Sequence, residues 1–110
     1  MSKDLDGVLA ALADPARRRV VDVLRVGPRR AGELAAAVEM SGPAMSRHLR
    51  VLRATGVVEA GALAGDARVR VYQLRSEPFL ALRAWLDQVE AFWVDQLGAF
   101  ADHVKEAGSE

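Results

Sequence analysis

The chain has 110 residues, 51% of them hydrophobic, and its 15 basic and 15 acidic residues give a formal net charge of zero. It contains no cysteine, which excludes disulfides, thiolate metal sites and thiol redox switches. No apolar run reaches the roughly 18 residues that a membrane span needs, and the N-terminus lacks the basic and apolar segments of a secretion signal. We therefore expect a cytoplasmic protein that forms one domain over residues 1–110 and has no membrane partner.

The charges are unevenly distributed along the chain. Residues 1–14 hold one lysine and three aspartates, and residues 76–110 hold two basic residues against seven acids. Residues 15–75 hold twelve arginines against five acids, a net charge of +7. A basic middle between acidic ends indicates that the middle alone would face the phosphates of a nucleic acid.

Two amphipathic helices are predicted at the start of the chain. The first, of about ten residues, has apolar residues at helical spacing: Leu5, Val8, Leu9 and Leu12. Asp14 and Pro15 provide the N-cap and first position of the second, which runs to residue 26 before Gly27 as C′ residue. Its first turn carries three arginines, which are either phosphate contacts or partners of the acidic last helix: Arg17, Arg18 and Arg19. The sequence does not decide which of them meets DNA.

Residues 31–54 predict a helix-turn-helix. Ala35 is small enough to let the two helices approach closely, and Glu39 stands in the turn where glycine is frequent because the backbone there has a positive φ. Ser41 caps the second helix, over residues 42–54, and Pro43 lies in its first turn. The inward stripe of this helix consists of Met45, Leu49 and Leu52.

The opposite side of the helix 42–54 is rich in arginine, and such a helix fits the major groove of DNA. We expect Arg47 and Arg50 to read bases, while Ser41, Ser46 and Arg53 position phosphates. His48 lies at the border between the core and this face. An ordinary helical hairpin with solvated arginines is the alternative.

A β-hairpin is expected over residues 57–74. A short strand over residues 57–60 precedes a glycine and alanine loop over residues 61–67, and residues 68–74 alternate as a strand does. Two strands directly after a recognition helix form the wing of a winged helix, which makes Arg68 and Arg70 candidates for DNA-backbone or minor-groove contacts. Because the loop holds no basic residue, a purely stabilising hairpin is the other interpretation.

The last helix, expected over residues 79–105, carries an apolar seam and a second apolar strip that a chain this small cannot cover. A second copy would cover them, with residues 1–13 and 79–105 as the dimerisation helices. The expected interface residues are Leu5, Leu9, Leu12, Trp85, Val89, Phe92, Trp93 and Phe100. An aromatic pocket for a small ligand is the alternative.

The predicted fold is mostly α with a small β-hairpin: four helices, two strands and a long last helix, in a winged helix-turn-helix arrangement. The blocks LADPARRRVVDVL, GELAAAV, SGPAMSRHLRVLRATGVV and RVRVYQL occur in that order. In this the chain resembles the ArsR/SmtB-type winged-helix repressors of bacteria, in particular small autorepressor-type members with a tryptophan-rich last helix. The resemblance implies a homodimer on a pseudo-palindromic operator. The DNA-contacting positions that it implies are Ser41, Pro43, Ala44, Ser46, Arg47, His48 and Arg50.

The chain departs from the metal-sensing members of that family. The segment that corresponds to their cysteine-bearing box reads Glu33-Leu34-Ala35-Ala36-Ala37, and the last helix has only one histidine, His103. We therefore expect no metal site and no cofactor, and any small-molecule effector is unidentified. No nucleophile–base set or phosphate loop indicates an enzyme. The alternative function is a protein-interaction module that has lost DNA binding and recruits a partner through the aromatic last helix.

Overall fold

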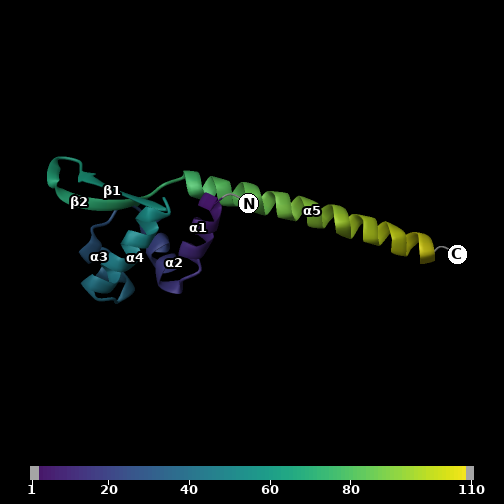
Figure 1. Cartoon of the computed structure of the whole chain (residues 1–110), viewed down its shortest axis with the longest axis horizontal. Helices are drawn as coiled ribbons and strands as arrows, with labels where there is room; N and C mark the ends of the chain where they lie inside the picture. The colour runs from purple at the N-terminus through teal and green to yellow at the C-terminus, as the bar shows by residue number, and fades with distance from the viewer. Residues whose placement is uncertain (1–2, 109–110) are drawn as a thin grey trace. The chain divides into compact units, whose positions relative to one another are not determined.

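The computed structural model describes residues 3–108 and, of these, the side chains of all but Lys3, Asp102 and residues 104–108. Residues 1 and 2, which begin the predicted 1–13 segment, lie outside the described residues, as do 109 and 110. The elements, labelled in Figure 1, are α1 (Lys3–Leu12), α2 (Pro15–Leu24), α3 (Ala31–Val38), α4 (Gly42–Ala54), β1 (Val58–Leu63), β2 (Asp66–Leu74) and α5 (Glu77–Gly108). This order confirms the predicted sequence of elements. The chain forms two compact units, Met1–Phe79 and Leu80–Glu110.

The unit Met1–Phe79 has one hydrophobic core, to which α1 to α4 and both strands contribute. Its most deeply buried large side chains come from four different elements and the residue before β1: Val20, Leu34, Met45, Leu49, Leu52, Val57 and Val58. The predicted inward stripe of α4 is therefore confirmed, with Met45 and Leu52 both 0% exposed. Burial of this stripe fixes which side of α4 faces outward.

Helix α2 ends earlier than predicted. It stops at Leu24 with Arg25 as its C-cap, and Gly27 does not adopt the positive φ of a C′ glycine. The amides of Val26 and Gly27 instead bond to the carbonyls of Val23 and Leu24, three residues back. This tightened last turn satisfies the free carbonyls, so no left-handed residue is needed.

The turn between α3 and α4 keeps at Glu39 the left-handed conformation that glycine adopts in such turns, so the glutamate is not accommodated by a different turn. Glu39 has φ 57° and ψ 56°, and it is the one non-glycine residue with positive φ among residues 3–108. Its amide and that of Met40 close the end of α3 by bonding to the carbonyls of Ala36 and Ala35. A glutamate therefore occupies a position that costs a side-chain-bearing residue about 1–2 kcal/mol.

The strands of the hairpin are longer and its loop is shorter than predicted. Residues 61–63 and 66–67, predicted as loop, belong to β1 and β2, and the register pairs Leu63 with Asp66 so that Ala64 and Gly65 alone make the turn. Gly65 supplies φ 87°, which suits a tight two-residue turn. Gly61 and Ala62 are residue types that are depleted in strands, yet their backbone groups pair with Val71 and Arg70, and this is why composition misplaced the strand end.

A third backbone segment joins the hairpin. Arg29 and Tyr72 exchange both amide-to-carbonyl hydrogen bonds, at 3.1 and 2.8 Å. The bridge ties the loop between α2 and α3 to the middle of β2, and the sequence pattern did not predict it.

Helix α5 has 32 residues, three more than predicted at its C-terminal end and two more at its start. From Leu80 onward it exposes seven large apolar side chains, each 50–66% exposed: Leu80, Leu86, Phe92, Trp93, Val94, Leu97 and Phe100. Within residues 3–108, none of the helices combines the length and apolar character needed to cross a membrane.

Candidate nucleic-acid interface

Helix α4 begins with a cap that the sequence predicted. The Ser41 hydroxyl accepts a hydrogen bond from the Ala44 amide at 3.3 Å, and proline occupies the first turn. This cap satisfies an amide that would otherwise be free and fixes the first residue of the helix. The rotational setting of α4 is then decided by its buried stripe.

The outward face of α4 holds most of the predicted DNA-contacting residues. Ser41, Pro43, Ser46, Arg47, Arg50 and Arg53 are exposed, whereas Ala44 and His48 are partly buried. Among the described residues, Arg47, Arg50 and Arg53 have no hydrogen bond or ion pair. The guanidinium groups on this face are therefore free to pair with an incoming anion, and guanidinium suits both guanine edges and phosphate.

Arg17, the first of the arginine triplet, crosses from α2 to α1 and α4. Its Nε donates to the Ala11 carbonyl at 2.6 Å, and its Nη2 donates to Ala10 at 3.4 Å. Its Nη1 lies 3.3 Å from Nδ1 of His48 and 3.8 Å from the Asp14 carboxylate. The ion pair of Arg17 is thus made at the start of its own helix.

The other two arginines of the triplet differ from Arg17. Arg18 is exposed and donates to the Leu12 carbonyl at 2.8 Å, whereas Arg19 is exposed without a partner among the described residues. The three adjacent residues therefore have three different surroundings, because successive helical positions point about 100° apart. Arg18 and Arg19 therefore both carry a charge that no described carboxylate compensates, and Arg19 also keeps all of its donors free.

Asp14 organises the start of α2. Its carboxylate accepts hydrogen bonds from the amides of Ala16 and Arg17 at 2.8 and 3.3 Å, which confirms the predicted N-cap. Partial burial acts to raise its pKa, but these amides, the Arg17 guanidinium and His48 outweigh it and hold the pKa of Asp14 below its ordinary value.

The two wing arginines make different contacts. The Arg68 guanidinium lies 3.4 Å from the Asp66 carboxylate, and its side chain is 92% exposed. The Arg70 guanidinium lies over the ring of Tyr72, 6.0 Å from its centroid. A surface ion pair this exposed is weak, so the Arg68 charge remains available to an external phosphate.

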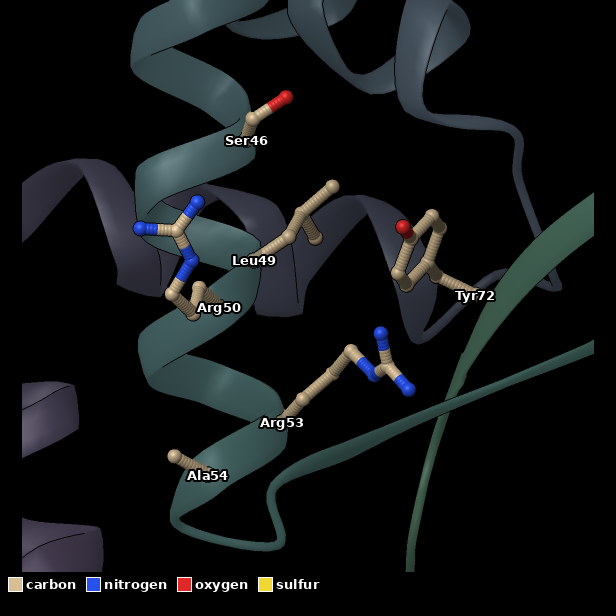
Figure 2. A pocket seen from close by; sticks show the side chains of 6 residues that line it. All are labelled: Ser46, Leu49, Arg50, Arg53, Ala54 and Tyr72. Atoms are coloured by element: carbon tan, nitrogen blue, oxygen red, sulfur yellow. The ribbon is translucent and has the colours of Figure 1, made fainter.

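A hollow lies between α4 and β2, lined by Ser46, Leu49, Arg50, Arg53, Ala54 and Tyr72 (Figure 2). Five of these, all but Tyr72, belong to the predicted recognition helix over residues 42–54. Sequence reasoning missed Tyr72, which it placed only on a strand face. Its partners Arg29 and Leu49 are distant in the chain, and a single aromatic residue in an alternating strand carries no signal for such a contact.

Helix α5, taken by itself, has the apolar surface that the dimer interpretation requires. Phe92 and Trp93 form an edge-to-face pair with ring centroids 6.4 Å apart, and both are more than half exposed. Trp85 and Val89 are partly buried. In α1, Leu5 is already buried within the single chain, while Leu9 and Leu12 are partly buried. The accessible part of the predicted interface thus lies mainly on α5.

No group of three or more histidine, aspartate or glutamate side chains that could hold a metal ion occurs in the part of the chain that the structure describes.

Comparison with known proteins identifies the family. The family model "Bacterial regulatory protein, arsR family" matches residues 14–60, from the cap of α2 into β1. The HTH-type transcriptional regulator Rv2034 of Mycobacterium tuberculosis is 39% identical over 105 residues, which are 96% of this chain and 92% of that protein. The transcriptional repressor SdpR of Bacillus subtilis is 35% identical over 54 residues, 49% of this chain and 60% of that protein.

A solved structure has the same architecture. The homodimeric winged helix-turn-helix DNA-binding domain of Mb0332 from Mycobacterium bovis, studied by solution NMR, superimposes with a TM-score of 0.62 at 26% identity. The match covers 84% of this chain and 83% of that one. The family resemblance and the winged helix-turn-helix fold expected from the sequence are both confirmed, and the chain belongs to the ArsR family of bacterial regulatory proteins.

Proposed function

We propose that the chain is a sequence-specific DNA-binding transcriptional repressor that acts as a homodimer and reads a pseudo-palindromic operator with α4. The observation that carries this proposal is the set of unpaired arginines Arg47, Arg50 and Arg53 on the outward face of a helix whose other face is locked in the core. Arg47 and Arg50 read base edges. Ser41, Ser46, Arg53, Arg68 and Arg70 position the DNA backbone.

The homodimer accounts for the exposed apolar surface of α5. A water-facing row of phenylalanine, tryptophan and leucine side chains is unfavourable in a monomer and typical of an interface core. Two copies also place two α4 helices on DNA, which a two-fold operator requires. The proposal assigns dimerisation to the segments 1–13 and 79–105, the helix-turn-helix to 31–54 and the wing to 57–74, within one functional domain. The homodimeric state of the Mb0332 domain supports it.

The relatives' roles favour gene regulation over the interaction-module alternative, because the matched proteins are a transcriptional regulator and a transcriptional repressor. Such a protein works in the cytoplasm, where bacterial chromosomal DNA lies, and the proposal includes no catalytic activity.

The test is a titration of the full chain against the duplex upstream of its own coding sequence and against an unrelated duplex, at two salt concentrations. The expected result is tight binding to the upstream duplex, with two protected half-sites about one helical turn apart. Equal, salt-sensitive binding to both duplexes would refute autorepression while leaving DNA binding intact. Failure to bind either duplex would refute the proposal and favour the alternative function, a protein-interaction module that has lost DNA binding.

A further inference from the structure

The hollow between α4 and β2 has a volume of about 430 Å³ (Figure 2). This volume falls in the range of sites that hold small molecules. All of its lining residues belong to the unit Met1–Phe79, so its shape depends only on the packing of that unit.

The polar groups around the hollow are donors without partners. Arg50 and Arg53 carry unpaired guanidinium groups, and the hydroxyls of Ser46 and Tyr72 have no hydrogen-bond partner among the described residues. Figure 2 shows Arg53 reaching from α4 toward the strand that carries Tyr72, whose hydroxyl points back toward α4. Since no carboxylate lines the hollow, its charge is wholly positive and it selects an anion.

The floor of the hollow is apolar and well supported. Leu49, 2% exposed, lies between Arg50 and the tyrosine ring and supports the hollow from below, and the exposed Ala54 adds a methyl group. Tyr72 is held by its two backbone hydrogen bonds to Arg29 and is covered by Arg70. A bare inorganic anion would pair with the arginines and leave the Ala54 methyl group and the exposed edge of the Tyr72 ring in contact with water.

We infer that the hollow is a binding site for a small organic anion, with a phosphate or carboxylate group attached to an apolar body about the size of one ring. The anionic group pairs with Arg50 and Arg53 and accepts from the Tyr72 hydroxyl. The apolar body covers Ala54 and the exposed edge of the Tyr72 ring.

Occupancy of this site regulates DNA binding, and this consequence rests on the proposed function. Ser46, Arg50 and Arg53 belong to the face of α4 that meets DNA in the proposal, so one set of guanidinium groups serves both partners. The ligand and the operator therefore exclude one another. A ligand that enters the hollow releases the repressor by direct competition, without requiring a second conformation of the protein.

The first arm of the test needs no DNA. Phenyl phosphate and inorganic phosphate are titrated separately into the full chain at matched ionic strength, with calorimetry for affinity and the Tyr72 ring protons followed by NMR. Phenyl phosphate is expected to bind roughly fivefold more tightly than inorganic phosphate and to shift the Tyr72 resonances. Equal affinities for the two phosphates would overturn the inference, and so would resonance shifts that do not include those of Tyr72. Either result would mean that the hollow binds anions only through the positive charge of its surface.

Matched variants locate the site. Arg53→Gln is expected to weaken phenyl phosphate binding about fivefold or more. Arg25→Gln removes the same charge from the exposed C-cap of α2, outside the hollow, and is expected to leave the affinity unchanged. An equal loss in both variants would overturn the inference, since it would show a response to net charge alone.

The second arm adds the operator duplex. Phenyl phosphate is expected to release the wild-type protein from DNA at concentrations where the same amount of inorganic phosphate does not. Wild-type protein that binds phenyl phosphate as expected but binds no duplex would refute the proposed function and leave the ligand site standing. Protein that binds DNA and phenyl phosphate together, with no competition, would overturn the inferred regulation.

Discussion

The guanidinium of Arg17 on α2 and the imidazole of His48 on α4 lie 3.3 Å apart, measured from Nη1 to Nδ1. Arginine can only donate, so this contact is a hydrogen bond when the His48 ring carries its proton on Nε2 and leaves Nδ1 as the acceptor. Arg17 also donates to the C-terminal end of α1 through Ala11. One side chain thus joins the three helices α1, α2 and α4 and favours this tautomer of a residue at the edge of the proposed DNA interface.

Replacement of this arginine tests that linkage. Arg17→Met is expected to lower the free energy of unfolding by about 1–2 kcal/mol, because the Ala11 carbonyl and His48 lose their donor in a partly buried setting. Urea denaturation measures the loss, and nitrogen NMR of the neutral His48 ring should show a larger fraction of the Nε2–H tautomer in the wild type than in the variant. Arg18→Met, which removes one exposed hydrogen bond, is the control and should cost less than half as much. Equal losses in the two variants would argue against a special role for Arg17.

The left-handed conformation of Glu39 predicts a stabilising substitution. Glu39→Gly removes a backbone strain of about 1–2 kcal/mol from the folded state. Because glycine also loses more conformational entropy on folding, the expected net increase in the free energy of unfolding is about 0.5–1 kcal/mol. Thermal or urea unfolding measures it. Glu39→Ala removes the same side chain but keeps the strained position, and it should not stabilise the protein. A gain of the same size in Glu39→Ala would place the effect in the side chain instead of the backbone.

The lowered pKa of Asp14 predicts how stability changes with pH. Because its folded-state pKa lies below its ordinary value of 3.8, ionised Asp14 stabilises the fold above that value, and this contribution is lost as the pH falls through the folded-state pKa. Asp14→Asn keeps a capping oxygen without the charge. The stability difference between wild type and Asp14→Asn, measured by urea unfolding at stepped pH, should be greatest near neutrality and shrink below pH 3.8. A difference that stays constant across this range would contradict the assignment.

Arg47 and Arg68 should differ in what they contribute to DNA binding. Arg47→Ala is expected to cost about 1–3 kcal/mol of operator affinity and to relax specificity at one base pair per half-site. Arg68→Ala should weaken binding to all sequences alike and reduce the salt slope by about one. Binding to the operator and to single-substitution operators over a salt series distinguishes the two effects. Unchanged operator preference in Arg47→Ala would mean that another side of α4 faces the groove.

Trp93 provides a test of the dimer. A carboxylate at this exposed position of α5 would be buried unpaired in the interface, so Trp93→Glu is expected to weaken self-association roughly tenfold or more. Native mass spectrometry and analytical ultracentrifugation measure it. Ala91→Glu introduces the same charge at an exposed position on the opposite side of the helix and should leave the dimer intact. A wild-type protein that is monomeric at all concentrations would refute the homodimer outright.

Local patterns in the sequence were sufficient for the helix-turn-helix. The spacing of Met45, Leu49 and Leu52 predicted the buried face of α4, and Ser41 and Asp14 predicted the caps that the structure contains. The place of Glu39 in the turn marked it as a position where glycine is frequent, but only the structure showed that the glutamate itself adopts the positive φ. Each of these features depends on residues within about one or two helical turns of one another, where the periodicity of the backbone determines which side chains share a face.

Only the tertiary structure decided the contacts between distant segments. The choice of Arg17 from three adjacent arginines, the bridge from Arg29 to Tyr72 and the hollow beneath Arg53 each join residues from different elements. The spacing of apolar residues predicts which face of a helix is buried, but it does not predict which residue of another element contacts that face. That depends on how the helices and the hairpin pack, and packing is a property of the whole core, so the pattern of any one segment does not contain it.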